Sequence, residues 1–404
     1  MKKVALFHPY KHHSYYSLKG IAKYTNQVIG VYGYYYKGDI LDRLVIKTKQ
    51  KKKIEGYEDR ETSRFVRTSL VVKGLYLLNK FIPVRFELLY FKVFQLWSKK
   101  FIKDHEVIHV LQDYLNGTVR WAYEQKKIIV YEHIQPFAKY QKEKLLEEIS
   151  KFNYPLEYAD AKFSNEMIQN QIENIRMSNV IIVASQASYD SLLPYVSEDK
   201  LRLIPYGSII SNSNIEEITN RINERKATNI LRVLYVGAFN LTKGVQYIIE
   251  AAKQLIGEDI EFTFIGKPTF EHDNVLINAV KNLPNAKYIE SVPHVEIYKQ
   301  YCTHDLFVFE ALFEGFGMVT LEAMTYGLPC IVAEGGKGVI VHGEDGYVHP
   351  NGDVKALVDY IKYLNKEREV LVRMGRKAFQ NVQNYTWSRY EDGIKNVYLE
   401  LEKL

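Results

Sequence analysis

Two glutamates eight positions apart mark the stretch of this sequence where chemistry is most readily expected. Glu314 and Glu322 enclose a Gly-x-Gly turn and a short apolar run, in the order EGFGMVTLEAMTYGLP. The glycines let the backbone approach a ligand closely. A helix expected from about Met318 would point unpaired N–H groups and the positive end of its dipole at the turn, which favours a phosphate. Carboxylates on both sides can accept hydrogen bonds from hydroxyl groups. The pattern suits a nucleotide-sugar, and the alternative is a capped surface helix with solvated glutamates.

The elements that must position this stretch are two strands and the helix between them. Residues 305–309 and 329–333 are short apolar runs typical of buried strands. Similar runs alternate with helical segments along the whole chain, at residues 4–9, 27–36, 106–111, 127–131, 179–185, 231–237 and 261–266. This alternation predicts βαβ units and parallel sheets. A chain of 404 residues is too long for one ordinary core, so two domains are expected.

The run from Glu314 to Pro329 resembles the donor-site signature of the retaining glycosyltransferases of family 4, which have the GT-B fold. Ordered motifs extend the resemblance over most of residues 170–404, whereas over residues 1–170 it rests on the strand pattern and His133. The resemblance implies two doubly wound Rossmann-like domains facing across a cleft. We expect an acceptor-binding domain at residues 1–210 and a nucleotide-sugar-binding domain at residues 211–384. A helix in residues 385–404 would cross back to the first domain, and residues 343–348 would form a closing loop.

The resemblance also assigns roles to residues of the second half. Glu314 would hold hydroxyl groups of the donor sugar, Glu322 would hold the ribose, and Lys243 would offset the charge of the leaving diphosphate. The backbone at Val292 and Pro293 would meet the base. The other donor contacts are expected from strand ends and from the glycine turn, at Gly237, Gly266, Lys267, Gly315, Phe316, Gly317, Met318 and Val319.

One departure from the family pattern concerns the charge at the diphosphate. The family often has an arginine directly after the strand glycine, and this chain has Ala238 there. Diphosphate binding would then depend more on Lys243 and on the helix beyond Gly315. Lys267 is a candidate for the missing positive charge.

Polar residues that follow the predicted strands of the first half are candidates for the opposite side of the cleft. His133 resembles the family's strand-end histidine near the donor sugar and is predicted to be catalytic; the alternative is a histidine bonded to a neighbouring carbonyl. Two histidines occupy the first loop, where the family has a glycine pair. Candidates for acceptor contacts are His12, His13, Asp113 and Tyr114.

The region Lys47 to Lys103 is rich in both basic and aromatic residues. Such a pattern at helical spacing is typical of a helix on an anionic membrane surface. It is equally typical of helices that pack their apolar side on a sheet and leave lysines in water. The sequence leaves both interpretations open.

Composition bounds the remaining possibilities. The net charge of +6 is modest, and no feature calls for nucleic acid as a partner. Two cysteines in apolar surroundings, Cys302 and Cys330, indicate free thiols in a reducing compartment. The N-terminal apolar run is too short for a signal peptide and no stretch is long enough to span a membrane. We therefore expect a cytoplasmic protein, peripheral on the inner membrane face if the membrane interpretation holds. No residue cluster suggests a metal or another cofactor.

The sequence thus predicts a retaining, metal-independent glycosyltransferase. It would move a sugar from a nucleotide-diphospho-sugar, with UDP as the default nucleotide, to a glycan or lipid-linked acceptor in cell-surface polysaccharide or glycolipid synthesis. The altered first loop and Ala238 favour a rival, a non-catalytic GT-B scaffold or partner subunit. A nucleotide-sugar epimerase or a phosphorylase fits the pattern less well. The sugar, the acceptor and the oligomeric state have no signature in the sequence.

Overall fold

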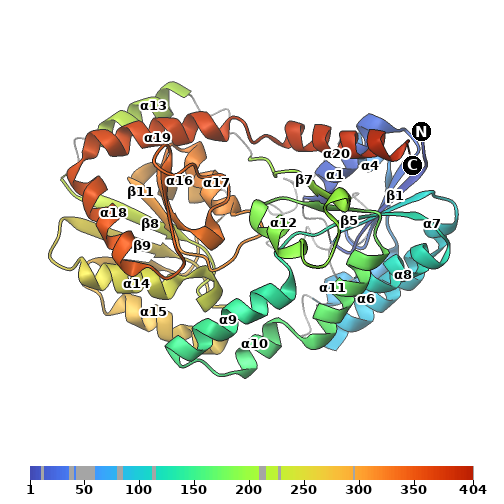
Figure 1. The fold of residues 1–404 in the computed structure, drawn as a ribbon, viewed down its shortest axis with the longest axis horizontal. Coiled ribbons are helices and arrows are strands. Elements are labelled where there is room, and N and C mark those ends of the chain that lie inside the picture. Colours follow the sequence, from blue (N-terminus) through green and yellow to red (C-terminus); the bar gives the residue numbers. More distant parts are fainter. Residues whose placement is uncertain are drawn as a thin grey trace.

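The computed structural model describes residues 1–10, 13–35, 41, 60–79, 85–111, 115–208, 215–225, 229–293 and 296–403. Two parallel sheets lie side by side, and helices cover both faces of each (Figure 1). This is the expected GT-B architecture of two Rossmann-like domains. No helix within the described ranges combines the length and apolar composition that crossing a membrane requires.

The first sheet has the strand order β3-β2-β1-β4-β5-β6-β7, with all described pairs parallel. Its central strands are buried along their whole length, as the continuous apolar runs predict. The strands are β1 (Val4–His8), β2 (Val28–Tyr32), β3 (Val66–Arg67), β4 (Val107–Leu111), β5 (Ile128–Glu132), β6 (Val180–Val183) and β7 (Leu201–Leu203). The helices are α1 (Ser14–Tyr24), α4 (Arg60–Ser63), α5 (Leu70–Asn79), α6 (Arg85–Ser98), α7 (Lys100–Lys103), α8 (Asn116–Glu124), α9 (Ala138–Phe152), α10 (Glu157–Lys162), α11 (Asn165–Met177), α12 (Gln186–Leu192) and the 3₁₀ turn η2 (Glu198–Lys200).

The second sheet has the order β10-β9-β8-β11-β12-β13, again parallel. Its strands are β8 (Leu231–Val236), β9 (Ile260–Ile265), β10 (Ala286–Ile289), β11 (Leu306–Phe309), β12 (Cys330–Ala333) and β13 (Gly346–His349). The helices are α13 (Ile215–Glu224), α14 (Val245–Gln254), α15 (Asn274–Lys281), α16 (Ile297–Thr303), α17 (Met318–Thr325), α18 (Val354–Lys366), α19 (Arg368–Val382) and α20 (Trp387–Leu401). Short 3₁₀ turns are η4 (Leu241–Lys243), η5 (Glu271–Asp273) and η6 (Glu334–Gly336).

Two predicted elements differ from the structure. In the described part of the apolar run at residues 27–36, the strand extends over Val28–Tyr32, because the chain leaves the sheet at Gly33. The segment expected as a closing loop at residues 343–348 is partly strand, since β13 pairs with β12 from Gly346 onward. β13 lies at the edge of the sheet and begins with the buried Gly346. A glycine at this position is typical of a loop, and for this reason the sequence did not indicate a strand.

Helix α20 lies on the first domain, although it ends the chain (Figure 1). It packs along α1, where a Cβ on Gly20 would lie 2.6 Å from the Glu391 carbonyl oxygen. The Ser17 hydroxyl is 2.9 Å from the Tyr390 hydroxyl. The chain passes between the domains twice, once near Ser208 and once near Tyr385. These two segments are in contact, because the Ser208 N–H donates to the Tyr385 carbonyl at 2.9 Å.

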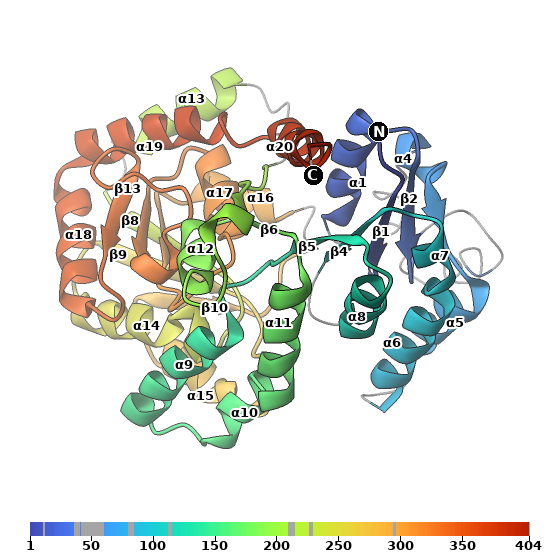
Figure 2. The ribbon, with the colours of Figure 1, turned by 45° about the vertical axis from the view of Figure 1, so that its right-hand side comes forward.

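A second connection between the domains involves α9 and α10, which lie beside α14 and α15 of the second domain (Figure 2). The Glu148 carboxylate on α9 accepts hydrogen bonds from the Tyr247 hydroxyl at 2.5 Å and the Gln246 amide at 3.2 Å. On α10, the Tyr158 hydroxyl donates to Asp273 Oδ1 at 3.0 Å. The domains are therefore joined on two sides, and the site described next lies between them.

Candidate functional site

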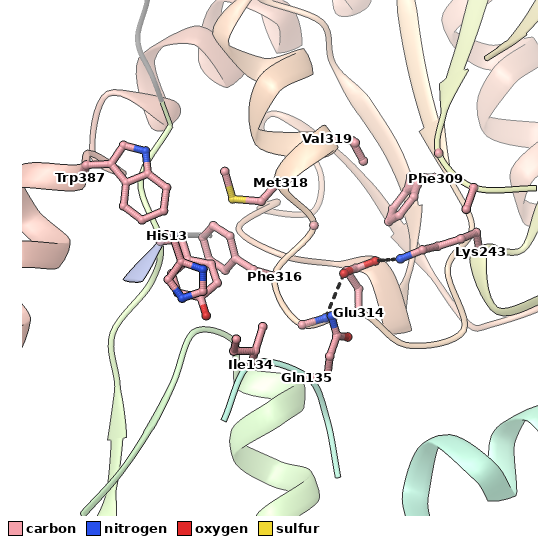
Figure 3. Close-up of a pocket in the computed structure, with 15 residues that line it drawn as sticks. His13, Ile134, Gln135, Lys243, Phe309, Glu314, Phe316, Met318, Val319 and Trp387 are labelled. Atoms are coloured by element: carbon pink, nitrogen blue, oxygen red, sulfur yellow. Dashed lines mark hydrogen bonds and ion pairs between the residues drawn. The ribbon is translucent and has the colours of Figure 1, made fainter. Parts of the chain in front are cut away.

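A cavity of about 390 Å³ lies between the two domains. Two segments of the first domain, the segment at Tyr206 that leads into the second domain, the second domain itself and the C-terminal helix all contribute to its wall. Figure 3 shows aromatic rings at one end and a lysine–glutamate pair at the other. The lining residues are His13, Ile134, Gln135, Tyr206, Gly237, Ala238, Lys243, Phe309, Glu314, Gly315, Phe316, Gly317, Met318, Val319 and Trp387.

The turn before α17 presents its backbone to this cavity. Gly317 has a φ of +78°, a left-handed conformation that glycine adopts without strain, and α17 begins at the next residue. A Cβ on Gly315 would lie 2.2 Å from the Ile134 carbonyl oxygen of the first domain, so only glycine permits this approach. The first N–H groups of α17 have no partners within the helix. The geometry of the turn suits an anion.

Lys243 and Glu314 form an ion pair at the charged end of the cavity (Figure 3). The Asn240 side chain caps the η4 turn by accepting from the Lys243 N–H at 3.1 Å. The other Glu314 oxygen accepts from the Gly315 N–H at 3.1 Å. The pair neutralises both groups, so an anionic ligand must compete with Glu314 for the lysine.

Lys243 owes its place to the glycine that follows it. Gly244 has a φ of +67°, and a Cβ there would lie 1.7 Å from the Glu310 carbonyl oxygen. The chain can turn from η4 into α14 at this point only without a side chain. Glycine at this position thus holds η4 against the end of β11.

Five predicted donor residues do not line the cavity. Glu322 is half-buried on α17 and accepts from the Tyr301 hydroxyl at 3.0 Å. The Lys267 side chain is 61% exposed and pairs with Glu290 at 3.4 Å, so it supplies no charge to the cavity wall. The other three are Gly266, Val292 and Pro293, of which the first follows β9 and the last two precede α16.

The predicted residues of the first domain fall into three groups. His13 lines the cavity. His133 is buried, with its ring centroid 5.7 Å from that of Tyr131, and it is the next two residues, Ile134 and Gln135, that reach the wall. The remaining candidates, His12, Asp113 and Tyr114, lie outside the described residues.

Behind His13 lies a buried polar network centred on Glu132, the last residue of β5. Its carboxylate accepts from His109 Nε2 at 2.7 Å and from the Tyr390 hydroxyl at 2.8 Å, and His13 Nε2 is 3.5 Å away. The Tyr398 hydroxyl is 2.7 Å from the other nitrogen of His109. Burial alone would raise the pKa of Glu132, but hydrogen bonding and charge attraction from His109, and then from His13, hold it well below its ordinary value. The network connects the C-terminal helix to the cavity wall.

The aromatic end of the cavity was not predicted. The Tyr206 ring lies 4.3 Å from the His13 ring, and Trp387 stacks on Tyr16 with ring centroids 3.8 Å apart. The close approach of the Tyr206 segment to the start of α20 requires glycine at position 207, because a Cβ there would lie 2.1 Å from the Trp387 backbone nitrogen. The only signals in the sequence were an aromatic beside a turn glycine and a tryptophan starting the last helix. Neither reveals that the two segments meet.

The comparisons with known proteins agree with this geometry. Residues 214–381 match the family model described as glycosyl transferases group 1. An uncharacterized glycosyltransferase of Methanocaldococcus jannaschii is 25% identical over 62% of this chain and 74% of its own length. The capsular polysaccharide biosynthesis glycosyltransferase CapM of Staphylococcus aureus is 29% identical over 46% of this chain and 52% of its own length. The structure of Anabaena HepE in complex with UDP and glucose aligns over the whole of both chains with a TM-score of 0.65 at 15% identity.

Residues 214–381 thus resemble the glycosyl transferases group 1 family, and the chain as a whole has the GT-B fold. The family match and the names of the relatives support a glycosyltransferase.

Proposed function

We propose that the protein is a retaining glycosyltransferase that uses a nucleotide-diphospho-sugar, with UDP-sugars as the default donors. The observation that carries this proposal is the convergence of Lys243, Glu314 and the N-terminal turn of α17 on one cavity between two domains. A lysine and unpaired helix N–H groups suit a diphosphate. HepE, which shares the fold, was solved with UDP and glucose, and this supports the choice of donor.

In the proposed reaction an acceptor oxygen forms a bond to the anomeric carbon while the bond from that carbon to the phosphate oxygen breaks. The acceptor attacks from the face that the diphosphate leaves, so the anomeric configuration is retained, and the departing phosphate takes the acceptor's proton. Lys243 and the α17 turn stabilise the charge that develops on the diphosphate. Glu314, released from the lysine, accepts hydrogen bonds from sugar hydroxyls, and Glu322 holds the ribose. We propose that no metal is needed, which a chelator tests directly.

The acceptor is proposed to enter at the aromatic end of the cavity. Tyr206 and Trp387 offer flat apolar faces of the kind that sugars stack on, and His13 lies beside them. Glu132 would hold the His13 ring in place and leave its other nitrogen for an acceptor hydroxyl. His133, which is buried and does not line the cavity, is proposed to position the donor sugar or the acceptor through the 134–135 segment. CapM is named for capsular polysaccharide biosynthesis, which supports a glycan or lipid-linked acceptor.

The membrane remains a proposed partner, and exposed side chains on α5 and α6 support a surface that could meet it. On α6, Tyr90, Phe91 and Phe94 pack into the core, in agreement with the core interpretation. The opposite sides of α5 and α6 nevertheless expose large apolar side chains, with lysines near them. The exposed residues are Leu70, Val71, Leu78, Leu88, Leu89, Leu96, Lys92, Lys99 and Lys100. We propose that this surface, the α5–α6 face, binds anionic lipid at the cytoplasmic side of a membrane.

The experiment that tests the function measures release of nucleoside diphosphate from UDP-, GDP- and ADP-sugars by the wild-type protein in chelator, with a lipid or glycan extract as acceptor. Turnover of one nucleotide class, with an axial or equatorial product linkage that matches the donor, supports the proposal. Turnover that appears only after a divalent ion is added would contradict the metal-free mechanism. Absence of turnover with every donor would favour the scaffold interpretation, which the uncharged Ala238 in the cavity wall also favours.

A further inference from the structure

The end of α10 in the first domain lies against both segments that carry the lysine–glutamate pair. The Lys162 ammonium donates to the Thr242 hydroxyl at 2.9 Å, and Thr242 directly precedes Lys243. The next residue along, Phe163, packs edge to face on Phe313 with ring centroids 6.0 Å apart, and Phe313 directly precedes Glu314. Both phenylalanines are buried. Lys162 is therefore placed beside the donor site by a packed contact between the domains.

The acceptor of this lysine is itself fixed by a chain of hydrogen bonds. The Thr242 hydroxyl donates to Asn240 Oδ1 at 2.8 Å, and Asn240 Nδ2 donates to the Thr269 hydroxyl at 2.7 Å. Asp273 accepts from the Thr269 N–H at 3.2 Å and from the Tyr158 hydroxyl at 3.0 Å. Tyr158 lies on α10, like Lys162, so the chain returns to the helix where it began. The position of the ammonium relative to η4 is thus specified by the fold.

Lys162 has no carboxylate in contact with it. Within the described ranges it forms no ion pair, and one neutral hydroxyl accepts one of its three N–H donors. Burial and the like charge of Lys243 lower the pKa of Lys162 to about 8, while Asp273 and Glu314 act in the opposite direction. A half-buried ammonium beside another lysine is unfavourable by itself. An anion bound near both lysines would remove that cost.

The donor cavity lacks a second positive charge in its described wall. Ala238 occupies the place where a side-chain charge was expected, and Lys267 turns away to Glu290. A diphosphate carries more charge than Lys243 alone can offset, and Lys243 is shared with Glu314. A cation from the first domain can supply the difference if the site binds a diphosphate.

We propose that Lys162 is this second cation, and that it leaves Thr242 to contact the donor diphosphate together with Lys243. Its ammonium lies behind η4 and does not line the cavity, so the contact requires the flexible stem to rotate toward the ligand. The inference rests on the proposed function, because it assumes a nucleoside diphosphate in the cavity. It adds that the first domain also binds the donor.

The test compares Lys162→Met, Lys162→Arg and the control Lys253→Ala by titration calorimetry. Lys253 is an exposed lysine at the end of α14 that pairs with Glu250, so its removal makes a comparable charge change away from the cavity. The probes are UDP, UMP, uridine and inorganic pyrophosphate. We expect Lys162→Met to weaken UDP and pyrophosphate by about tenfold or more, as for one lost charge-assisted hydrogen bond, with a smaller effect on UMP and none on uridine. Lys162→Arg should retain most of the affinity.

The melting temperature without ligand separates this role from a folding defect. Because methionine removes an uncompensated charge and keeps the stem, Lys162→Met should be at least as stable as the wild type. Equal affinity of Lys162→Met and wild type for UDP and pyrophosphate would overturn the inference and leave the proposed function intact. Equal weakening of uridine and UDP would overturn it too, since that indicates a structural role. A wild-type protein that binds neither UDP nor pyrophosphate would overturn both proposals.

Discussion

Lys243 and Glu314 bind each other, although each is expected to bind a different part of the donor. In the ion pair the lysine is unavailable to phosphate and the carboxylate is unavailable to sugar hydroxyls. Removing the glutamate charge should therefore free the lysine. We predict that Glu314→Gln binds UDP several-fold more tightly than the wild type, while its rate of sugar transfer falls by about 10²-fold or more, as for a lost electrostatic contact in a transition state. Calorimetry and product release measure the two effects, and weaker UDP binding would contradict the competition.

Lys162 gives the site a dependence on pH whose sign follows from its lowered pKa. Burial lowers the pKa of Lys162 in the fold from the ordinary 10.5 to about 8. The folded protein therefore holds fewer protons than the unfolded chain between these values, and this group makes stability rise with pH there. The charged groups facing it are Lys243, Asp273 and Glu314.

Diphosphate binding has the opposite trend, because only the protonated lysine attracts the ligand. UDP affinity of the wild type should fall as the pH rises from about 7 to about 9, and Lys162→Arg should be nearly flat because arginine stays protonated. Titrations at several pH values in one salt concentration measure both proteins. An equal decline in the two would assign the pH dependence to another group.

At the scale of elements, η4 and β11 are held together by a glycine contact. Gly244→Ala would force a side chain into a left-handed backbone and against the Glu310 carbonyl, which lies 1.7 Å from the added carbon. The backbone conformation alone should cost about 1–3 kcal/mol of unfolding free energy. Denaturant unfolding measures the loss, and Gly257→Ala is a matched control because Gly257 also has a positive φ but has open space around it. Equal losses in the two variants would show that the contact with Glu310 is unimportant.

The elements of the second half were the most predictable part of the chain. The strand, glycine turn and helix from 305 to 325 follow one another in sequence, so local patterns contain both the fold and the placement of Glu314. The contacts that the sequence could not predict join distant segments. Trp387 meets His13, and Lys162 meets Thr242, through the way α20 and α10 dock on the other domain. Spacing carries no information on such docking, and it did not indicate that the Lys267 side chain pairs with Glu290 and does not line the cavity.

At the scale of the whole molecule, the α5–α6 face gives the first domain an exposed apolar surface with lysines around it. If this face meets anionic lipid, the protein should sediment with vesicles of phosphatidylglycerol at low salt and much less at high salt, since screening weakens surface attraction. The double variant Leu88→Ser, Leu96→Ser should lose binding. A matched control is Leu156→Ser, which changes an equally exposed leucine between α9 and α10. Indifference of the wild type to vesicles at low salt would remove the membrane from the proposal.

The two domains are joined at α20 on one side and at α9 and α10 on the other (Figure 2). The central claim is that the cavity between them holds a nucleotide-sugar. The most direct measurement is a thermal-shift screen of UDP-, GDP- and ADP-sugars on the wild type and on Glu322→Ala. A ligand at a hundred times its dissociation constant should stabilise the fold by about 2.7 kcal/mol. We predict that one nucleotide class stabilises the wild type and stabilises the variant much less. Stabilisation of neither protein by any of the three classes would contradict the claim.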